Sequence, residues 1–343
     1  MAQEGQHKSA RRRATSYDVA ALAGVSQSAV SRCFKDGASI SQKTRAKVLK
    51  AAESLNYQPN AIARGLITQR SNLAAVIVSS QINFYYPEVL SQLTEQFAQR
   101  GIRVLLFTIQ NPSDSYRALD ELWRYQVDGV ISASYLSRDQ YALLEARGIP
   151  TVLFNRFFSD RPSHSTWCDP ADATQALVDH LVENGHQHFA MIEGPSDSQV
   201  NMIRTRAVER ALATHGLQLR ARARGSYRYE SAGQAVDSLL RARTSMTALI
   251  CANDMMAMGA IDQLRQQHGL DVPRDISVAG FDGIGAGQFA SYTLTTIRQP
   301  IARMTQHTVD TLLNDLEGDE KTPERVAFAG EFMRGSSTGK ASD

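Results

Sequence analysis

Hydrophobic positions in most of the chain follow two alternating patterns. From residue 73 onward, short apolar runs such as Leu73–Val78 and Val104–Ile109 are separated by longer amphipathic stretches such as Pro87–Gln99. Strands that alternate with helices form right-handed βαβ units and parallel sheets. About 270 residues are enough for two such lobes, so we expect an α/β body with two parallel-sheet lobes. Further strands are predicted at Val127–Ala133, Thr151–Phe154, Phe189–Ile192, Ala248–Cys251 and Ser277–Phe281.

The first part of the chain predicts three short helices instead. Thr15 and Asp18 have the spacing of a capping box at the start of the first helix. Ser26 is a suitable cap for a second helix over Gln27–Phe34, and Ser41 for a third. Two short helices joined by a tight turn that contains a glycine are typical of a helix-turn-helix unit. We therefore expect a small all-α helix-turn-helix head in front of the α/β body.

The charge distribution supports this division. The net charge is only +2, but residues 1–70 hold twelve Lys and Arg against four Asp and Glu. A basic head on a mildly acidic body is expected to bind a polyphosphate such as DNA. The alternative is a solvated basic tail. The second predicted helix has polar residues on its outer side, where Gln suits adenine, Arg suits guanine and Ser suits a base or a phosphate: Gln27, Ser28, Ser31 and Arg32.

The remaining composition is that of a soluble cytoplasmic protein. Hydrophobic residues make up 43% and charged residues 21% of the 343 residues. No apolar run approaches the roughly 20 residues of a membrane span, and the first residues are polar, unlike a signal segment. The three cysteines are far apart, which argues against a disulfide scaffold. We expect a cytoplasmic localisation.

The run from Thr15 to Arg32 resembles the N-terminal signature of the LacI/GalR family of bacterial transcriptional regulators. The resemblance continues through the helix that follows Ser41 and into the body, at Asn253-Asp254, at residues 275–282 and at Leu294–Pro300. It implies a periplasmic-binding-protein-like pair of lobes joined by three crossovers. It also implies a homodimeric repressor that binds a pseudo-palindromic operator and responds to a small molecule. The DNA-binding positions that it implies in the head are Thr15, Ser26, Gln27, Ser28, Ser31 and Arg32.

The joint between head and body carries its own pattern. Pro59 ends the third helix, and Asn60 can cap a new one. Residues 60–66 form only about two turns, too few for a stable isolated helix. A plain linker is one interpretation. The resemblance implies a hinge helix that folds on operator DNA, with Asn60 and Ala63 at the DNA and Leu66 as a wedge in the minor groove.

The expected organisation has four parts. They are a basic flexible N-terminal extension at residues 1–14, a helix-turn-helix domain at 15–58, a hinge and linker at 59–70, and an effector-binding and dimerisation domain at 71–343. Within that last domain, the N-terminal lobe is expected at about 71–168 and 300–323. The C-terminal lobe is expected at about 169–299 and 324–338.

The ends of the body strands predict a ligand cleft. The carboxyl ends of parallel strands collect ligands, and polar residues follow several predicted strands. By resemblance, sugar-responsive members bind hydroxyl groups at the positions of Arg204, Asn253 and Asp282. Asp254 is expected to cap a helix instead, and Arg206 is a competitor for the role of Arg204. The expected effector is a sugar or sugar derivative, bound by Tyr85, Tyr86, Asn155, Arg204, Tyr227, Asn253 and Asp282, with Trp167 as a further aromatic cover.

Two other functions fit less well. A dinucleotide-binding enzyme would need a different glycine spacing from that of Gly283–Gly287. His180, His186 and His188 suit surface or capping positions better than a metal site, so we expect no enzyme activity, no cofactor and no metal. A periplasmic binding protein alone would leave residues 15–66 unexplained.

Overall fold

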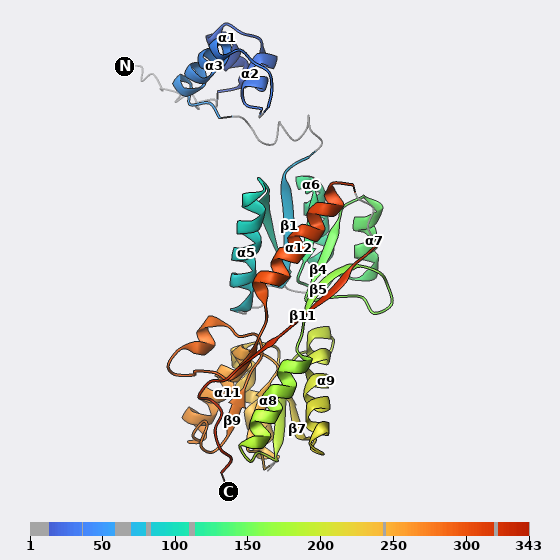
Figure 1. The fold of residues 1–343 in the computed structure, drawn as a ribbon, viewed down its shortest axis with the longest axis vertical. Helices are drawn as coiled ribbons and strands as arrows, with labels where there is room; N and C mark the ends of the chain where they lie inside the picture. The colour runs from blue at the N-terminus through green and yellow to red at the C-terminus, as the bar shows by residue number, and fades with distance from the viewer. Residues whose placement is uncertain are drawn as a thin grey trace, which may run out of the picture. The chain divides into compact units, whose positions relative to one another are not determined.

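The computed structural model describes residues 14–35, 37–58, 70–79, 84–109, 114–242, 245–318 and 322–342. The chain divides into two compact units, Met1–Ser71 and Asn72–Asp343, here called the head and the body (Figure 1). Most of the expected N-terminal extension lies outside the described residues. The expected hinge contacts at Asn60, Ala63 and Leu66 also lie outside them.

The head consists of the three predicted helices, α1 (Ser16–Ala23), α2 (Gln27–Cys33) and α3 (Gln42–Ser54). The capping box is confirmed, because the Thr15 backbone N–H donates to Asp18 Oδ2 at 2.8 Å and the Asp18 N–H donates to Thr15 Oγ1 at 3.4 Å. The side chains of Ser26 and Ser41 cap α2 and α3 in the same way. A small core holds the three helices together, with Val19, Val30, Cys33, Val48 and Ala52 buried in it. The helix-turn-helix prediction is therefore confirmed at the level of the fold.

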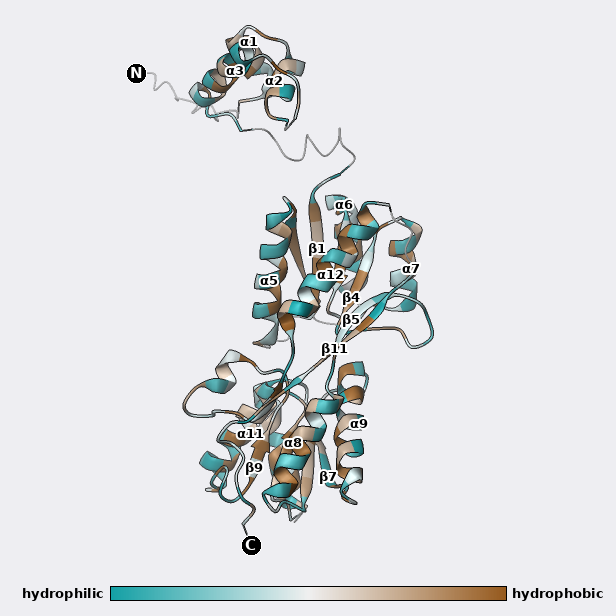
Figure 2. Cartoon of the chain, viewed as in Figure 1, coloured by the Kyte–Doolittle hydropathy of each residue, from teal (hydrophilic) through white to brown (hydrophobic). Residues whose placement is uncertain are grey.

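The N-terminal lobe of the body is a six-stranded parallel sheet with helices on both faces. Its elements are β1 (Leu73–Ser79), α5 (Tyr85–Gln99), β2 (Arg103–Ile109), α6 (Asp114–Tyr125), β3 (Gly129–Ser132), α7 (Arg138–Ala146), β4 (Thr151–Phe154), β5 (His164–Asp169), α12 (Ile301–Leu316) and β11 (Arg325–Ala329). The strand order is β11-β5-β4-β3-β1-β2. Alternate residues of β1 enter two different cores, since one face packs on α5 and α12 and the other on α6 and α7. This double cover explains why the central strands β1, β3 and β4 are continuous buried runs, and β1 is brown in Figure 2.

The C-terminal lobe repeats the design with a four-stranded parallel sheet in the order β7-β6-β8-β9. Its elements are α8 (Ala171–Glu183), β6 (Phe189–Glu193), α9 (Gln199–Thr214), β7 (Leu219–Arg224), α10 (Tyr229–Arg241), β8 (Ala248–Cys251), α11 (Asp254–Gln267) and β9 (Ser277–Ala279). A short antiparallel pair, β10 (Thr296–Arg298) with β12 (Glu331–Met333), completes the body. The expected class, an α/β body of two parallel-sheet lobes, is confirmed. Among the described residues, no helix has the length and apolar character that crossing a membrane requires.

One expected lobe boundary is wrong. Residues 324–338 were assigned to the C-terminal lobe, but β11 pairs in parallel with β5 of the six-stranded sheet, with Arg325 opposite Ser165. The chain crosses between the lobes only after β11, which ends at Ala329, and Gly330 separates β11 from β12. A Cβ atom at Gly330 would lie 2.9 Å from the side chain of Ile297, so only glycine fits where two crossing segments approach each other. The other two crossings follow β5 and β10.

Candidate functional site

A pocket of about 230 Å³ lies between the two lobes of the body. Strands from both sheets end at this pocket, as expected for parallel sheets. The N-terminal lobe contributes Ser79, Tyr85, Tyr86, Ile109, Ser134, Tyr135, Asn155 and Arg156 to its lining. The C-terminal lobe contributes Pro195, Asp197, Ser198, Val200, Arg204, Tyr227 and Asp282, and Gln299 lines it from a crossing segment.

The floor of the pocket contains a buried ion pair. Arg204 of α9 donates from Nη2 to Asp282 Oδ1 at 2.6 Å, and from Nη1 to the carbonyl oxygen of Ala252 at 2.6 Å. The two charged side chains are only 8% and 4% exposed. Burial opposes the charge of Arg204, but Asp282 together with Tyr227 and Cys168 outweighs burial and raises the pKa of the guanidinium. The pair is therefore a fixed arrangement of donors and acceptors facing the pocket.

Gln299 connects this ion pair to the other lobe. Its amide nitrogen donates to Asp282 Oδ1 at 2.8 Å. Its amide oxygen accepts from the Tyr85 hydroxyl and from Asn155 Nδ2, each at 3.0 Å. Asn155 Nδ2 also donates to the Tyr85 hydroxyl at 3.0 Å, and the Cys168 N–H donates to Asn155 Oδ1 at 3.2 Å. One continuous hydrogen-bond network thus joins both lobes at the pocket.

Three pocket residues have an unusual backbone. Asn155, Tyr227 and Asp282 have φ values of 53°, 62° and 117°, in the region that non-glycine residues seldom occupy. The ring of Tyr227 lies so close to the β6–α9 turn that a Cβ atom at Gly194 would be 2.4 Å from it. Residues held in strained conformations concentrate at functional sites, and three of them around one pocket support its assignment as the binding site.

Neighbouring residues Asn253 and Asp254 lie differently from the expectation. Asn253 was expected to contact the effector, but it is fully buried and caps α11 by accepting from the Met256 N–H at 3.0 Å. Its Nδ2 donates to the carbonyl oxygen of Tyr227, so it supports a pocket residue from behind. Asp254, expected to be the cap, accepts instead from the Ile284 N–H and the Thr296 hydroxyl. Burial raises the pKa of the Asp254 carboxyl well above its usual value.

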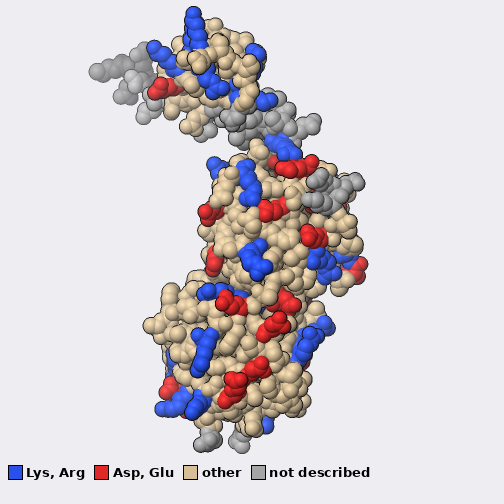
Figure 3. Space-filling model, in the orientation of Figure 1, with Lys and Arg blue, Asp and Glu red and all other residues tan. Residues whose placement is uncertain are grey.

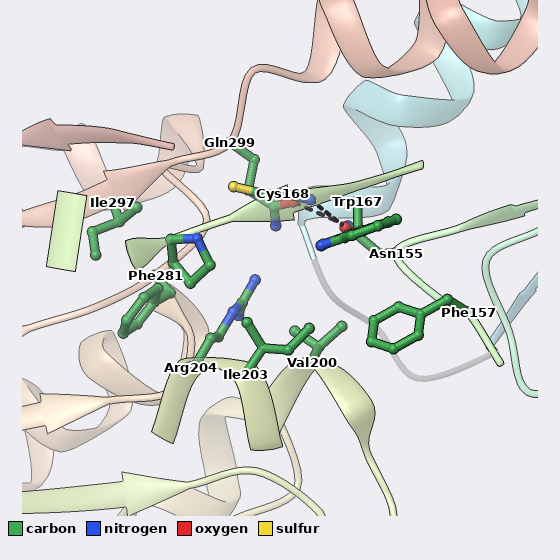
Figure 4. A pocket seen from close by; sticks show the side chains of 11 residues that line it. Asn155, Phe157, Trp167, Cys168, Val200, Ile203, Arg204, Phe281, Ile297 and Gln299 are labelled. Carbon is green, nitrogen blue, oxygen red and sulfur yellow. Dashed lines mark hydrogen bonds between the residues drawn. The ribbon is translucent and has the colours of Figure 1, made fainter. Parts of the chain in front are cut away.

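The aromatic residues fall into two groups. Tyr85, Tyr86 and Tyr227 line the pocket, and burial raises the pKa of all three phenols, so they stay protonated donors. Trp167 lines a smaller apolar chamber behind Asn155 instead, with its ring 5.1 Å from that of Phe157. Figure 4 shows these two rings facing the α9 side chains Val200, Ile203 and Arg204, and Phe281 and Ile297 on the far side of the chamber.

The sequence prediction missed several lining residues. Gln299 is the most important, because it bridges the lobes. The sequence could have indicated Gln299, because it is a polar residue between a strand and Pro300, where the chain passes from one lobe to the other. Ser198 was also missed, although its hydroxyl caps α9 and lies 3.0 Å from the Tyr227 hydroxyl. Arg206 is exposed on α9 and does not line the pocket, so it does not compete with Arg204.

The DNA-binding residues predicted in the head lie just before α1, in the turn between α1 and α2, and on α2. Ser28, Ser31 and Arg32 are exposed, while Gln27 is half-buried and donates to Ser16 Oγ at 3.4 Å. Ser26 and Thr15 serve as helix caps. Figure 3 shows Lys and Arg side chains over the visible face of the head, with few acidic ones. This distribution suits contact with a polyanion.

No group of three His, Cys, Asp or Glu side chains suited to a metal occurs among the described residues. Two of the histidines considered in the sequence are engaged with the C-terminal tail. His180 Nε2 lies 3.0 Å from the Thr338 hydroxyl, and His186 Nε2 lies 3.0 Å from the carbonyl oxygen of Gly339.

A helix-turn-helix head combined with a two-lobed body that encloses a polar pocket defines a DNA-binding transcriptional regulator with a small-molecule effector. Residues 15–60 match the family described as bacterial regulatory proteins, lacI family, and residues 178–338 match a periplasmic binding protein-like domain. The chain belongs to the lacI family of bacterial regulatory proteins.

Two curated relatives match over almost their whole length. The HTH-type transcriptional regulator AscG of Escherichia coli (strain K12) is 30% identical over 327 residues, which are 93% of this chain and 97% of AscG. The probable HTH-type transcriptional repressor ExuR of Bacillus subtilis (strain 168) is 31% identical, over 92% of this chain and 96% of ExuR.

Solved structures agree with this assignment. The Lac repressor dimer bound to operator and the anti-inducer ONPF has a TM-score of 0.87 at 29% identity, covering 96% of this chain and 100% of that one. The complex of the transcriptional regulator CelR with cellobiose has a TM-score of 0.72 at 27% identity, covering 95% of this chain and 100% of CelR.

Proposed function

We propose that this protein is a homodimeric repressor that binds a pseudo-palindromic operator, and that a small carbohydrate-like effector in the body pocket controls its operator affinity. The observation that carries this proposal is the network around Gln299, which both lines the pocket and joins the two lobes. A ligand that exchanges hydrogen bonds with this network changes the contact between the lobes. Two similar solved complexes support the choice, since one contains operator and the other cellobiose.

The base-reading role is assigned to Gln27, Ser28 and Arg32, with Ser31 directed to a base or a phosphate. Arg32 is exposed near the end of α2, where a guanidinium can bond to the two acceptors of guanine. Arg32→Ala should weaken operator binding by about 1–3 kcal/mol and relax the preference at one base position in each half-site. Binding-site selection with the full chain measures this effect.

A matched control is available on α3. Lys47 is exposed there, and Lys47→Ala should weaken binding to all sequences alike, because phosphate contacts carry no base information. An unchanged consensus for Arg32→Ala would contradict the base-reading assignment.

The effector role rests on the chemistry of the pocket. Its lining offers a guanidinium, amides, carboxylates and hydroxyls beside aromatic rings, a combination that binds vicinal hydroxyl groups and the apolar face of a sugar. Its volume of about 230 Å³ lies below the roughly 300–1,000 Å³ of drug-sized sites. A monosaccharide-sized effector is therefore favoured over a longer oligosaccharide.

We expect a dimer because of the number of base contacts that selective DNA binding requires. One helix-turn-helix unit makes too few base contacts for selectivity, so two half-sites need two heads. The body has an exposed sheet edge at β2, where Leu106 is 50% exposed, and this is the kind of surface that a second copy can cover. Sedimentation should show a dimer at micromolar concentration, and a stable monomer would count against the proposal.

The hinge is assigned to residues 59–70, with Asn60 and Ala63 at the DNA and Leu66 in the minor groove. In this proposal the hinge helix is too short to fold without its dimer mate and DNA. An effector that moves the two N-terminal lobes apart separates the paired hinges, and operator affinity falls because they unfold. Leu66→Ala should weaken operator binding and leave effector binding to the DNA-free protein intact. If Leu66→Ala binds operator as tightly as the parent, residues 59–70 act only as a linker and the hinge assignment is wrong.

We further propose that the protein binds its effector without converting it, and acts in the cytoplasm, where the operator is. The Cys168 thiol near the pocket supports a binding role. Burial raises the pKa of Cys168 to about 12, so the thiol stays protonated and is a poor nucleophile at neutral pH. Incubation of a bound sugar with the protein should return it unchanged.

A further inference from the structure

Four of the residues that line the pocket are charged: Arg156, Asp197, Arg204 and Asp282. Arg204 and Asp282 neutralise each other through the 2.6 Å ion pair. Arg156 is different, because it makes no ion pair or side-chain hydrogen bond with any of the described residues. It is half-buried at the pocket wall. The pocket lining therefore includes one guanidinium that has no ion-pair partner among the described residues.

Arg156 lines the same pocket as two phenols, one from each lobe. Burial raises the pKa of both Tyr86 and Tyr227, and the positive charge of Arg156 opposes the rise at each. Tyr86 belongs to the N-terminal lobe and Tyr227 to the C-terminal lobe, so Arg156 faces a pocket that residues of both lobes line. A group bound by Arg156 would contact both lobes at once.

The backbone that carries Arg156 is held in place. The preceding residue, Asn155, has a left-handed backbone conformation, and its N–H donates to the Thr166 carbonyl oxygen at 2.7 Å. The Asn155 side chain is fixed on one side by the Cys168 N–H and on the other by Gln299. A binding side chain that extends from a fixed backbone loses less entropy when it meets its ligand.

An acidic ligand group is the partner that this arrangement fits. A guanidinium is always charged, and it binds carboxylate and phosphate groups through two parallel hydrogen bonds. Asp197 is the internal alternative, but it is exposed, and it forms no ion pair with Arg156 among the described residues. Tyr227, Ser198 and the Arg204–Asp282 pair also line the pocket, and they can exchange their present hydrogen bonds for bonds to ligand hydroxyl groups.

We infer that the effector is a monosaccharide-sized molecule with an acidic group, and that Arg156 binds this group between the two lobes. The inference rests on the proposed effector site and narrows its ligand class. The ligand class is therefore an anionic sugar. Its negative charge can come from a carboxylate or from a phosphate group.

The test uses the full chain and measures both melting temperature and calorimetric binding. The probes are glucuronate, galacturonate and gluconate, glucose 6-phosphate, and the neutral controls glucose, galactose and glucuronate methyl ester. At least one acidic probe should raise the melting temperature, while its neutral counterpart should bind at least about ten-fold more weakly. Comparison of the three sugar carboxylates with glucose 6-phosphate shows which of the two acidic groups the protein prefers.

Arg156→Met should weaken binding of that acidic probe by about ten- to a hundred-fold, and Arg156→Lys by less, because the charge remains without the planar fork. Arg206→Met is the matched control, since Arg206 is exposed on α9 away from the pocket, and it should leave binding unchanged. Asp197→Asn should tighten binding of the acidic probe, because it removes a like charge.

Three results would overturn the inference. In the first, neutral sugars bind as tightly as acidic ones and change operator binding, so that the proposed function stands and only the acidic class falls. In the second, Asp197→Asn weakens binding as much as Arg156→Met. This result would mean that the two side chains pair with each other across the lobes and do not bind the ligand's acidic group. In the third, no probe binds although the protein still binds operator, and then the carbohydrate effector falls together with this inference.

Discussion

Asp282→Asn is the substitution that tests the centre of the site. Asparagine keeps the size of the side chain and tolerates the positive φ of 117° at this position, so backbone strain does not confuse the result. The change removes the charge that faces Arg204 at 2.6 Å and turns one acceptor oxygen into an amide donor. Arg204 stays protonated and 8% exposed, and it is left without a counter-ion.

Breaking a buried ion pair on one side costs about 3–5 kcal/mol, because the remaining charge has lost both water and its partner. For a domain of this size the same loss corresponds to a melting temperature lower by about 6–20 °C. Arg204→Met should cost a similar amount. The double variant should be more stable than the sum of the two losses predicts, by on the order of 1–3 kcal/mol, because neither charge then remains unpaired.

Urea unfolding of the four proteins, followed by fluorescence and circular dichroism, gives the coupling free energy. Asp160→Asn is the control, because Asp160 pairs with Arg138 at the surface, where the side chains are 51% and 64% exposed. The control should cost less than about 1 kcal/mol. If Asp282→Asn costs no more than the control, or if the two single losses add, the buried pair does not hold the pocket floor.

Three further outcomes are expected. Gln299→Leu should weaken effector binding by about ten-fold and reduce the effect of effector on operator affinity, because it removes the amide that joins the lobes; titration with and without operator measures both, and an unchanged response would exclude the bridge. Burial lowers the pKa of His180 and His186, so the unfolded chain takes up protons at a higher pH than the folded one. Stability should therefore fall as the pH drops below about 6.5, and a variant with glutamine at both positions should show a flatter profile in urea unfolding at pH 5 to 8. Thr15→Ala should destabilise the head by about 0.5–2 kcal/mol, because it removes the capping box; calorimetry of the full chain would contradict this if the head transition did not move.

Local interactions explain which parts of the structure the sequence determined. The capping box joins Thr15 to Asp18, three positions along the chain, and the caps at Ser26 and Ser41 have the same sequence separation. Strands such as β4 and β8 begin and end where their apolar runs do. The residues that follow strand ends, Asn155 and Asp282 among them, could be placed at a cleft because parallel strands end at one edge. Head, class of body and location of the pocket therefore followed from short-range patterns.

Only the tertiary structure decided which of these residues meet. Arg204 and Asp282 are 78 residues apart, and Tyr85 and Gln299 are 214 apart. The adjacent Asn253 and Asp254 have similar side chains but different environments. Asn253 caps α11, whereas Asp254 accepts hydrogen bonds from Ile284 and Thr296. β11 joined the N-terminal sheet for the same reason, because its partner β5 lies about 160 residues earlier in the chain. Periodicity records which face of an element is buried. The partner across a sheet edge or a pocket is selected by packing and charge pairing between segments that meet only in the folded chain.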